Sequence, residues 1–414
     1  MKRRVPIALA RLVLLSLGTA SSGCGSGPDP SQGSAVMGVQ VSPGNNNNGY
    51  TQGIAVGSST LYAAFAGSLT SVRFDGTGSR MGLFNQGGSV LEVALAGDGS
   101  VWWVGGGMGP GWAMGGPSMG LWTSSNAAFL TTGSGATPAA LACSTANVGM
   151  TQSGSPTPYG LVADDRWVIV AIASTSAPMS GPPGVPDAQN WPGQQAMLAP
   201  SVGASLRRFD RQNASSPMQL LAGVSSLATA LTSHVLAQSA DEVYWLDASD
   251  AVSTRVMRAS KSQWTAGQVL ATAPPNSATG IAANDSYVVW ATSAPPEPGA
   301  TGCAVFASHG DGPAEKIYDG AQAPFLCWGM ALDDTYAYFT TTEVVVEFPN
   351  DQGGPIYLMG TGLGRVRLTG GPLQTVPLAS GRWYGARRVL VDAQYVYAID
   401  PSFVTRVDKS VFGG

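Results

Sequence analysis

The sequence predicts an all-β fold built from repeated units of short strands. The chain has 414 residues, including Gly 55 and Pro 28, with 44% hydrophobic and 11% charged residues. That is too apolar for a disordered chain, and it falls well short of the roughly 25% charge of an ordinary domain. Apolar and aromatic runs of four to six residues alternate with Asp, Asn, Gly and Ser, a pattern typical of short strands joined by turns.

One unit recurs along the chain and can be aligned on a single aromatic or β-branched position. That position falls at Tyr62, Trp102, Ile169, Tyr244, Val289, Tyr338 and Tyr397. The shorter spacings of 40, 45 and 49 residues match the length of a four-stranded propeller blade, and the longer ones require insertions. We therefore expect a single β-propeller of seven blades, with six or eight as alternatives because the widest spacings leave room for another unit. A solenoid is the alternative architecture, but the units show no helical half.

The last unit lacks a fourth strand after Lys409. Residues 35–41 alternate between small or polar and apolar side chains, as a strand does. We expect this segment to complete the last blade and close the ring, so that residues 35–414 form the propeller domain.

Two polar features recur with the units. An Asp or Asn, as at Asp333 or Asn284, stands where a tight turn is expected, and its side chain can bond the nearby backbone. We interpret these residues as turn formers and not as catalytic acids. An arginine also recurs, and we expect it on the polar face of a strand opposite an acidic neighbour; it stands at Arg73, Arg207, Arg255, Arg365 and Arg406.

The first 23 residues have the features of a secretory signal peptide. Lys2, Arg3 and Arg4 precede an apolar stretch at residues 5–17, and small residues lead to Cys24. The apolar stretch is shorter than the roughly 20 residues of a membrane-spanning helix. Residues 24–34 are rich in Gly, Ser and Pro and predict a flexible tether.

The Ser22-Gly23-Cys24 ending resembles the lipobox of bacterial lipoproteins, in which the cysteine is lipidated and becomes the mature N-terminus. Ser21 departs from that pattern, because the family usually has Leu there, and plain signal-peptidase cleavage is the alternative. Gly25 stands where Asp would favour retention at the inner membrane, so the resemblance implies an outer-membrane lipoprotein, on its periplasmic side or at the cell surface, held to the membrane only by its lipid.

Loss of residues 1–23 would remove four of the 21 basic residues and none of the 25 acidic ones. The mature chain would then carry a net charge of −8, a poor match for the phosphates of nucleic acid. In an oxidising compartment the remaining cysteines can pair. Cys303 and Cys327 are the favoured disulfide, with Cys143 as a buried apolar residue, although three cysteines leave the connectivity open.

The units resemble the blades of YWTD and NHL-type β-propellers, which are common in bacterial secreted proteins. Tyr244-Trp245-Leu246-Asp247 is the nearest match to the YWTD signature, and the resemblance extends over about residues 50–412. It implies the fold and not a function, because propellers host many activities.

The insertions gather at one kind of connection. Residues 105–118, 174–203, 293–302 and 341–362 all fall between second and third strands, and residues 144–158 fall between an outer strand and the next first strand. In a four-stranded meander both kinds of connection emerge on the same face, which we expect to be a recognition face. Its candidate binding residues are Trp112, Trp191, Met108 and Asp187, although the tryptophans could equally pin the loops to the disc.

The leading functional hypothesis is a lipid-anchored, non-enzymatic recognition module for a glycan or an envelope protein, without a cofactor. The alternatives are a propeller lyase or hydrolase, as in the streptogramin-lyase group that the units also resemble, and a purely structural envelope scaffold. The two histidines, His234 and His309, lie off the long loops, and no HExxH motif is present. Three acids, Glu343, Glu347 and Asp351, are weak candidates for a cation site, which a solvated acidic loop explains as well.

Overall fold

The structure is a computed structural model, and its strands form antiparallel sheets throughout. It describes residues 36–40, 51–65, 68–74, 80–82, 88–107, 118–124, 156–174, 202–213, 219–224, 227, 235–250, 253–274, 278–293, 302–321, 323, 325–349, 355–378, 388–399 and 403–413. Within these residues there are seven sheets, six of four strands and one of three. We call each sheet a blade and number the blades 1 to 7 by their first strands.

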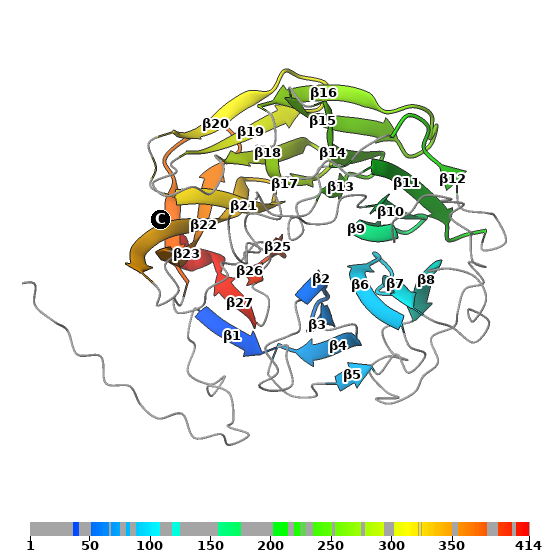
Figure 1. The fold of residues 1–414 in the computed structure, drawn as a ribbon, viewed down its shortest axis with the longest axis horizontal. Coiled ribbons are helices and arrows are strands. Elements are labelled where there is room, and N and C mark those ends of the chain that lie inside the picture. The colour runs from blue at the N-terminus through cyan, green and yellow to red at the C-terminus, as the bar shows by residue number, and fades with distance from the viewer. Residues whose placement is uncertain are drawn as a thin grey trace, which may run out of the picture. The chain divides into compact units, whose positions relative to one another are not determined.

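Each blade is an up-and-down meander, and Figure 1 shows the first strands gathered round the middle of the ring. The first strands are β2 (Thr51–Val56), β6 (Gly88–Leu95), β9 (Pro156–Ala163), β13 (Leu236–Gln238), β17 (Ala278–Ala283), β21 (Phe325–Leu332) and β25 (Arg388–Val391). The second strands are β3 (Thr60–Phe65), β7 (Val101–Gly107), β10 (Trp167–Ser174), β14 (Glu242–Asp250), β18 (Tyr287–Ser293), β22 (Tyr336–Pro349) and β26 (Tyr395–Ile399).

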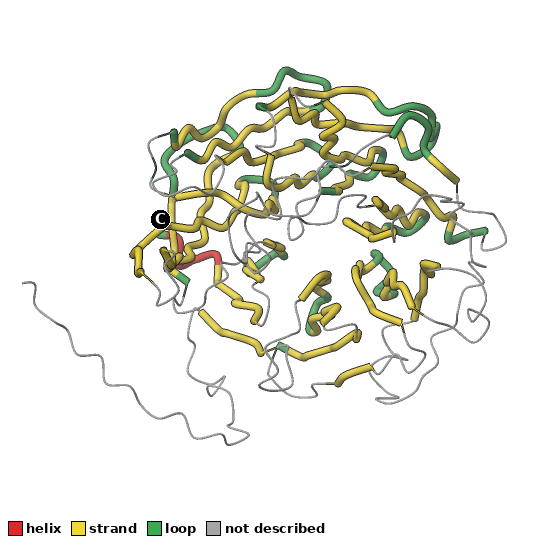
Figure 2. The backbone as a smooth tube through the Cα atoms, viewed as in Figure 1, coloured by secondary structure: helices red, strands yellow, loops and turns green. Residues whose placement is uncertain are grey.

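The outer half of each blade completes the meander. The third strands are β4 (Ser68–Arg73), β8 (Ser118–Ser124), β11 (Val202–Asp210), β15 (Ser253–Ser260), β19 (Cys303–His309), β23 (Pro355–Arg367) and β27 (Phe403–Asp408). The fourth strands are β5 (Arg80–Gly82), β12 (Gln219–Leu220), β16 (Gln268–Ala273), β20 (Glu315–Gly320), β24 (Gln374–Pro377) and β1 (Val36–Gln40). A 3-10 helix, η3 (Lys409–Phe412), follows β27. Strand dominates the described backbone, as Figure 2 shows, and no helix within it is long and apolar enough to cross a membrane.

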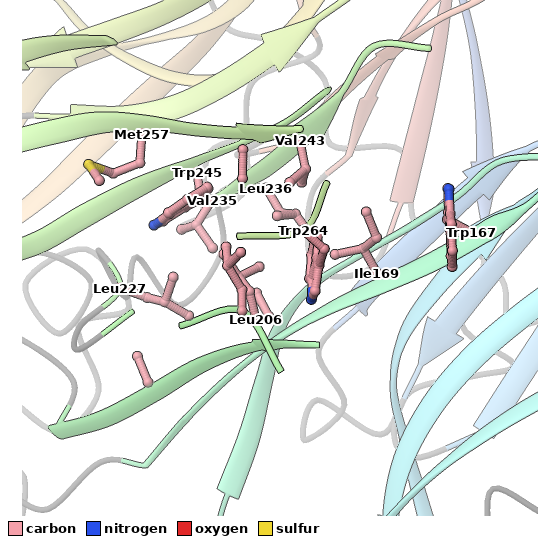
Figure 3. Packing of buried hydrophobic residues seen from close by; sticks show 14 residues of the cluster. Trp167, Ile169, Leu206, Leu227, Val235, Leu236, Val243, Trp245, Met257 and Trp264 are labelled. Atoms are coloured by element: carbon pink, nitrogen blue, oxygen red, sulfur yellow. The ribbon is translucent and has the colours of Figure 1, made fainter. Parts of the chain in front are cut away.

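The core is divided among the interfaces between blades. Because successive side chains of a strand point to opposite faces, neighbouring aromatics of a second strand enter different interfaces: Tyr244 packs toward blade 5 and Trp245 toward blade 3. Seven such clusters of buried residues exist among the described residues, one for each pair of adjacent blades, including blades 7 and 1. Figure 3 shows the cluster between blades 3 and 4, where Trp245 and Trp264 lie among aliphatic side chains. The ring is therefore closed by packing at every interface.

The aligned aromatic position of the sequence is one structural position. In all seven blades this residue of the second strand lies opposite the next-to-last residue of the first strand, as Tyr62 lies opposite Ala55 and Tyr397 opposite Leu390. Five of the seven residues are aromatic, and each of these five is buried, with at most 8% of its surface exposed. Tyr and Trp at this position bury large apolar surfaces between the blades. The repeat that the sequence predicts is confirmed, and with it the single β-propeller.

The ring is completed by the N-terminal strand. β1 pairs antiparallel with β27, with Val36 opposite Val407 and Gln40 opposite Phe403. In Figure 1 this strand, in blue, lies beside the red strands of the chain's other end. Blade 7 thus takes its fourth strand from the other end of the propeller, as the sequence predicts.

The two ends of the blades differ in what they carry. We call the end where first strands begin and second strands end the loop face, and the opposite end, where each first strand turns into the second, the turn face. All the second-to-third connections at residues 108–117, 175–201 and 294–301 join strand ends at the loop face. The expected loop at residues 341–362 is different: β22 runs to Pro349 and β23 starts at Pro355, so most of it is a long hairpin.

Candidate functional site

A central channel is the cavity that all seven blades share. It has a volume of about 320 Å³ and is lined by three successive residues of every first strand, from residues 54–56 in blade 1 to residues 389–391 in blade 7. Each first strand is the terminal strand of its sheet, so the inner edge of its backbone faces the channel. The described residues that line it include no Asp, Glu, Lys, Arg, His or Cys, and Gln238 is the one polar side chain among them.

An ion pair lies at the loop-face end of this channel. Glu92 in β6 and Arg388 in β25 each precede the lining residues of their strands, and they bond in a bidentate manner across blade 1. The distance from Arg388 Nη1 to Glu92 Oε2 is 3.0 Å, and the residues are only 5% and 3% exposed. The pair therefore ties blade 7 to blade 2, the two neighbours of blade 1.

Close packing of blade 1 brings these charges together. The equivalent residue of blade 1 is Gly53, where a Cβ atom would lie 2.6 Å from the Cα of Glu92. Only glycine allows the strands to approach this closely. Burial raises the pKa of the Glu92 carboxyl above its ordinary value, and the charge and hydrogen bonds of Arg388 oppose that rise.

The turn face is built from repeated side-chain-to-backbone bonds. Asp333 Oδ1 accepts hydrogen bonds from the N–H groups of Thr335 and Tyr336 at 2.9 and 2.8 Å. The same pair of bonds forms at Asp164, Asn284 and Asp392. The interpretation of these acids as turn formers is confirmed, because a local acceptor at this position fixes the turn.

An arginine joint locks blade 3 to blade 4 at this face. The Arg208 guanidinium lies 4.1 and 5.1 Å from the ring centroids of Trp167 and Trp264. It donates to Gln219 Oε1 at 2.7 Å and to the carbonyl of Lys261. We define the arginine joint by six residues, these five and Asp164, which accepts from Lys261 Nζ at 2.6 Å.

The joint between blades 6 and 7 repeats the same six roles. Arg365 lies between Tyr336 and Phe412 at 4.3 and 4.8 Å, and it donates to Gln374 Oε1 and to the Lys409 carbonyl at 2.6 and 3.1 Å. Lys409 Nζ donates to Asp333 Oδ2 at 2.7 Å. In both joints the acid precedes the first aromatic by three residues, and the lysine precedes the second by three. The two joints are thus one device used twice.

The five arginines that recur in the sequence do not all occupy the same position in their blades, which corrects the prediction. The shared register position, opposite the aligned aromatic, is held by Arg208, Arg258, Arg365 and Arg406. Arg73, Arg207 and Arg255 lie at other positions of their strands. The expected acidic partner across the ladder is found for Arg255, 2.6 Å from Asp247, whereas Arg365 and Arg406 stack on aromatic rings.

The acids of both joints are stabilised as carboxylates. Burial alone raises the pKa of Asp164, but hydrogen bonds from Lys261 and from the backbone N–H groups of Trp167 and Arg166 outweigh it, so that the pKa lies below its usual range. The pKa of Asp333 is lowered in the same way by Lys409 and the turn backbone. Folded-state pKa values below those of the unfolded chain mean that this stabilisation is present above about pH 4 and is lost as the pH falls through the folded values.

Lys261→Met and Lys409→Met are each expected to lower the free energy of unfolding at pH 7 by about 1.5–3 kcal/mol, because each removes a charge-assisted donor from a half-buried carboxylate. Denaturant unfolding measures the effect. Lys316→Met is the matched control: its partner Asp319 is exposed, so this substitution should change the free energy of unfolding far less than either joint variant does. The difference between each joint variant and the wild type should shrink below about pH 4. A loss equal to that of the control, or one independent of pH, would contradict the account of the joint.

The structure describes only some of the site residues that the sequence predicts. Eight of the residues singled out above lie outside the described residues: Cys24, Met108, Trp112, Cys143, Asp187, Trp191, His234 and Asp351. Glu343 and Glu347 belong to β22, opposite Gly360 and Tyr357 of β23. His309 is exposed at the turn face, its ring 4.9 Å from that of Tyr287. Across the described part of the chain, no group of three or more His, Cys, Asp or Glu residues could hold a metal ion.

A disulfide joins Cys303 of β19 to Cys327 of β21, the pair that the sequence favours. The two Cα atoms are 5.3 Å apart, and both residues are buried. Because β19 is the third strand of blade 5 and β21 the first strand of blade 6, the bond fastens one blade to the next. Such bonds persist in oxidising compartments.

Sequence reasoning missed both the channel and the Glu92–Arg388 pair. The channel is lined by apolar residues of ordinary strands, so nothing in any single unit marks it. A signal for the pair did exist: Glu92 and Arg388 are charged where the aligned units have glycine or valine, as at Gly53, Gly160, Val235, Gly280 and Gly329.

Comparisons with known proteins agree with the architecture. No family model and no curated protein matches the sequence. Among solved structures, "YCF48 bound to D1 peptide" is 10% identical, with 91% of this chain and 98% of that chain covered and a TM-score of 0.51. A streptogramin B lyase structure is also 10% identical, with 90% and 97% covered and a TM-score of 0.50. These similarities concern the fold alone, and by that measure the chain is a β-propeller.

Proposed function

We propose that the chain is a non-enzymatic recognition module, tethered to the outer membrane through Cys24, whose loop face binds an envelope protein or a glycan. The observation that carries the proposal is the position of the long connections. The long connections of blades 2, 3 and 5 join strand ends at the loop face, and the extended hairpin of β22 and β23 projects from the same face. Rigid scaffolds commonly carry their binding residues on such loops.

Contacts between the blades support the view that the propeller is a rigid scaffold for those loops. The blades are fastened to one another by hydrophobic clusters, by two arginine joints and by the Cys303–Cys327 disulfide. A scaffold that moves little lets loops bind at a lower entropic cost. The disulfide also supports an oxidising location, as the envelope is.

A protein partner has support from a structural neighbour, since one similar propeller is described as bound to a peptide. A lyase activity is the alternative, and another similar propeller is a streptogramin B lyase. The chemistry of the described residues favours binding: the channel wall offers no general base, and His309 lies at the turn face, away from the long connections.

A capture experiment tests the proposal. Residues 25–414 are used as bait against envelope extract and a polysaccharide panel, beside a variant with residues 108–117 and 175–200 replaced by short Gly-Ser links. We expect the first form to capture a partner and the variant to lose it, with an unchanged thermal transition. Equal capture by both forms would overturn the assignment to the loop face. Capture by neither would favour the scaffold alternative.

A further inference from the structure

The hairpin of β22 and β23 extends beyond the rest of blade 6. β21 pairs with β22 only as far as Glu343, and β24 pairs with β23 only as far as Gly362. Leu378, the residue after β24, is buried in the cluster between blades 6 and 7, so the chain has left the edge of β23 there. In the part of the chain that the structure describes, residues 344–349 and 355–361 therefore have no strand beside them except the other arm of the hairpin.

The outer edge of β23 carries a row of unpaired backbone groups. The N–H of Leu368 donates to the carbonyl of Thr335, which fixes the positions of β23 that bond to β22. Because bonded positions alternate along an antiparallel ladder, Gly360 bonds to β22, whereas Met359 and Thr361 turn their N–H and C=O groups outward. Another strand can bond to these groups in the same way that β24 bonds to the rest of β23.

This edge lacks the features that usually protect an exposed strand, which are charges, proline and bulges. The opposite edge of the hairpin, in β22, is interrupted by a bulge between Val344 and Val346. The outer strand of blade 5, β20, carries Lys316 and Asp319. Residues 356–361 of β23 contain no charge and no proline, and the extra residue of the bulge is not theirs. A two-stranded ribbon is marginally stable by itself, so a third strand would stabilise it.

The register of the hairpin indicates which residues a third strand should carry. Successive positions of a strand alternate between its two faces. Val346, Phe348, Ile356 and Leu358 consequently fall on one face of the ribbon. A third strand with an apolar residue at every second position would extend this face.

The charge of the hairpin favours a basic partner. Residues 336–364 contain three acids, Glu343, Glu347 and Asp351, and no Lys, Arg or His. Like charges would oppose pairing with the hairpin of a second copy of this chain, whereas Lys or Arg in another protein would be attracted.

We propose that the open edge of β23, from Ile356 to Thr361, binds an extended segment of a partner protein as an additional antiparallel strand. Every second residue of that segment is apolar, and the residues between them include Lys or Arg. The backbone bonds provide affinity, and the alternating residues provide specificity. This inference rests on the proposed function, because it identifies the partner of the loop face as a protein with an accessible extended segment and not as a glycan.

A synthetic peptide tests the edge directly. Its sequence is Thr-Val-Lys-Val-Lys-Val-Thr with blocked ends, and it can lie opposite residues 355–361 with its valines on the apolar face. The full chain is used with Cys24→Ser, and binding is measured by ligand-observed NMR. We expect binding at millimolar peptide concentration that weakens with added salt, and weaker binding of the same peptide with Glu in place of Lys. No binding at that concentration, or equal binding of the Glu peptide, would overturn the proposal.

Methylation of the peptide backbone tests the bonding pattern. The third and fifth peptide residues would lie opposite Met359 and Tyr357, with their N–H groups toward β23. N-methylation of these two residues removes both donors and should weaken binding about tenfold or more. N-methylation of the second and fourth residues, whose N–H groups point away, is the matched control and should change binding little. Equal effects of the two modifications would show that the peptide does not bind as a strand, and would overturn the proposal.

Proline variants place the site on β23. Met359→Pro removes an outward N–H and leaves the bonds to β22 in place, so it should weaken peptide binding about tenfold. Thr272→Pro, at an outward position of the uncharged outer strand β16, is the matched control and should bind as the wild type does. Binding that survives Met359→Pro, or that is lost with Thr272→Pro, would overturn the assignment, and the methylated peptides decide if Met359→Pro disturbs the hairpin. A chain that captures an envelope partner but binds none of the peptides would overturn this inference and leave the proposed function intact.

Discussion

Methionine in place of Arg388 is expected to lower the free energy of unfolding by about 3–5 kcal/mol, because it leaves the Glu92 carboxylate buried without its counter-charge. Glu92 is 3% exposed, and both of its oxygens bond Arg388. Chemical denaturation at pH 7 measures the loss. The effect should exceed that of any single lysine in the arginine joints, whose acids keep their backbone hydrogen bonds.

The double variant Glu92→Leu/Arg388→Met separates the pair from its surroundings. Replacing both charges by apolar groups should recover most of the lost stability, since the desolvation penalty disappears with the charges. The sign of the pH dependence follows from the raised pKa of Glu92. The folded state then holds the proton more tightly than the unfolded state, so Arg388→Met should be less destabilising near pH 5 than at pH 8. A loss below about 1 kcal/mol, or a double variant as unstable as the single one, would contradict this role.

Deletion of residues 35–42 should lower the free energy of unfolding by about 5 kcal/mol. The deletion removes β1, which pairs with β27 over five residues, and each backbone hydrogen bond contributes about 0.5–1.5 kcal/mol. It also leaves the outer edge of β27 open, which favours association with other chains. Thermal unfolding and size-exclusion chromatography measure the two effects.

Deletion of residues 25–32 is the control for the loss of N-terminal residues, and it should leave the thermal transition unchanged. A synthetic peptide of residues 35–42 added to the deleted protein should restore part of the stability, whereas a scrambled peptide should not. A deleted protein as stable as the control would show that the ring does not depend on this strand.

The fold could be predicted from the sequence because all the blades share one sequence pattern. The aligned position from Tyr62 to Tyr397 proved to be one register position, and the need for an extra strand after Lys409 predicted β1 correctly. The alignment of the recurrent arginine is wrong in blades 1, 3 and 4, because Arg73, Arg207 and Arg255 do not lie at the shared register position. Adjacent arginines such as Arg207 and Arg208 look alike in sequence, although one position along a strand reverses the face.

The sites were harder to predict because they arise between blades. Glu92 and Arg388 are 296 residues apart and meet only once the ring closes. The joint residues Asp164, Arg208 and Lys261 come from three separate turns and strands, and their shared spacing is visible only once the second joint is known. The candidates Trp112 and Trp191 stay predictions, since they lie outside the described residues.

Capture by forms of the protein that are blocked on one face distinguishes recognition at the loop face from recognition at the turn face. Single cysteines are introduced at Ala321, near the loop-face end of β20, and at Thr335, in a turn of the turn face, in a Cys143→Ala background, and each is coupled to a polyethylene glycol chain. Both positions are exposed. We expect the adduct at position 321 to lose the captured envelope partner and the adduct at position 335 to keep it. Loss of capture with the adduct at position 335 alone would place recognition at the turn face instead of the loop face.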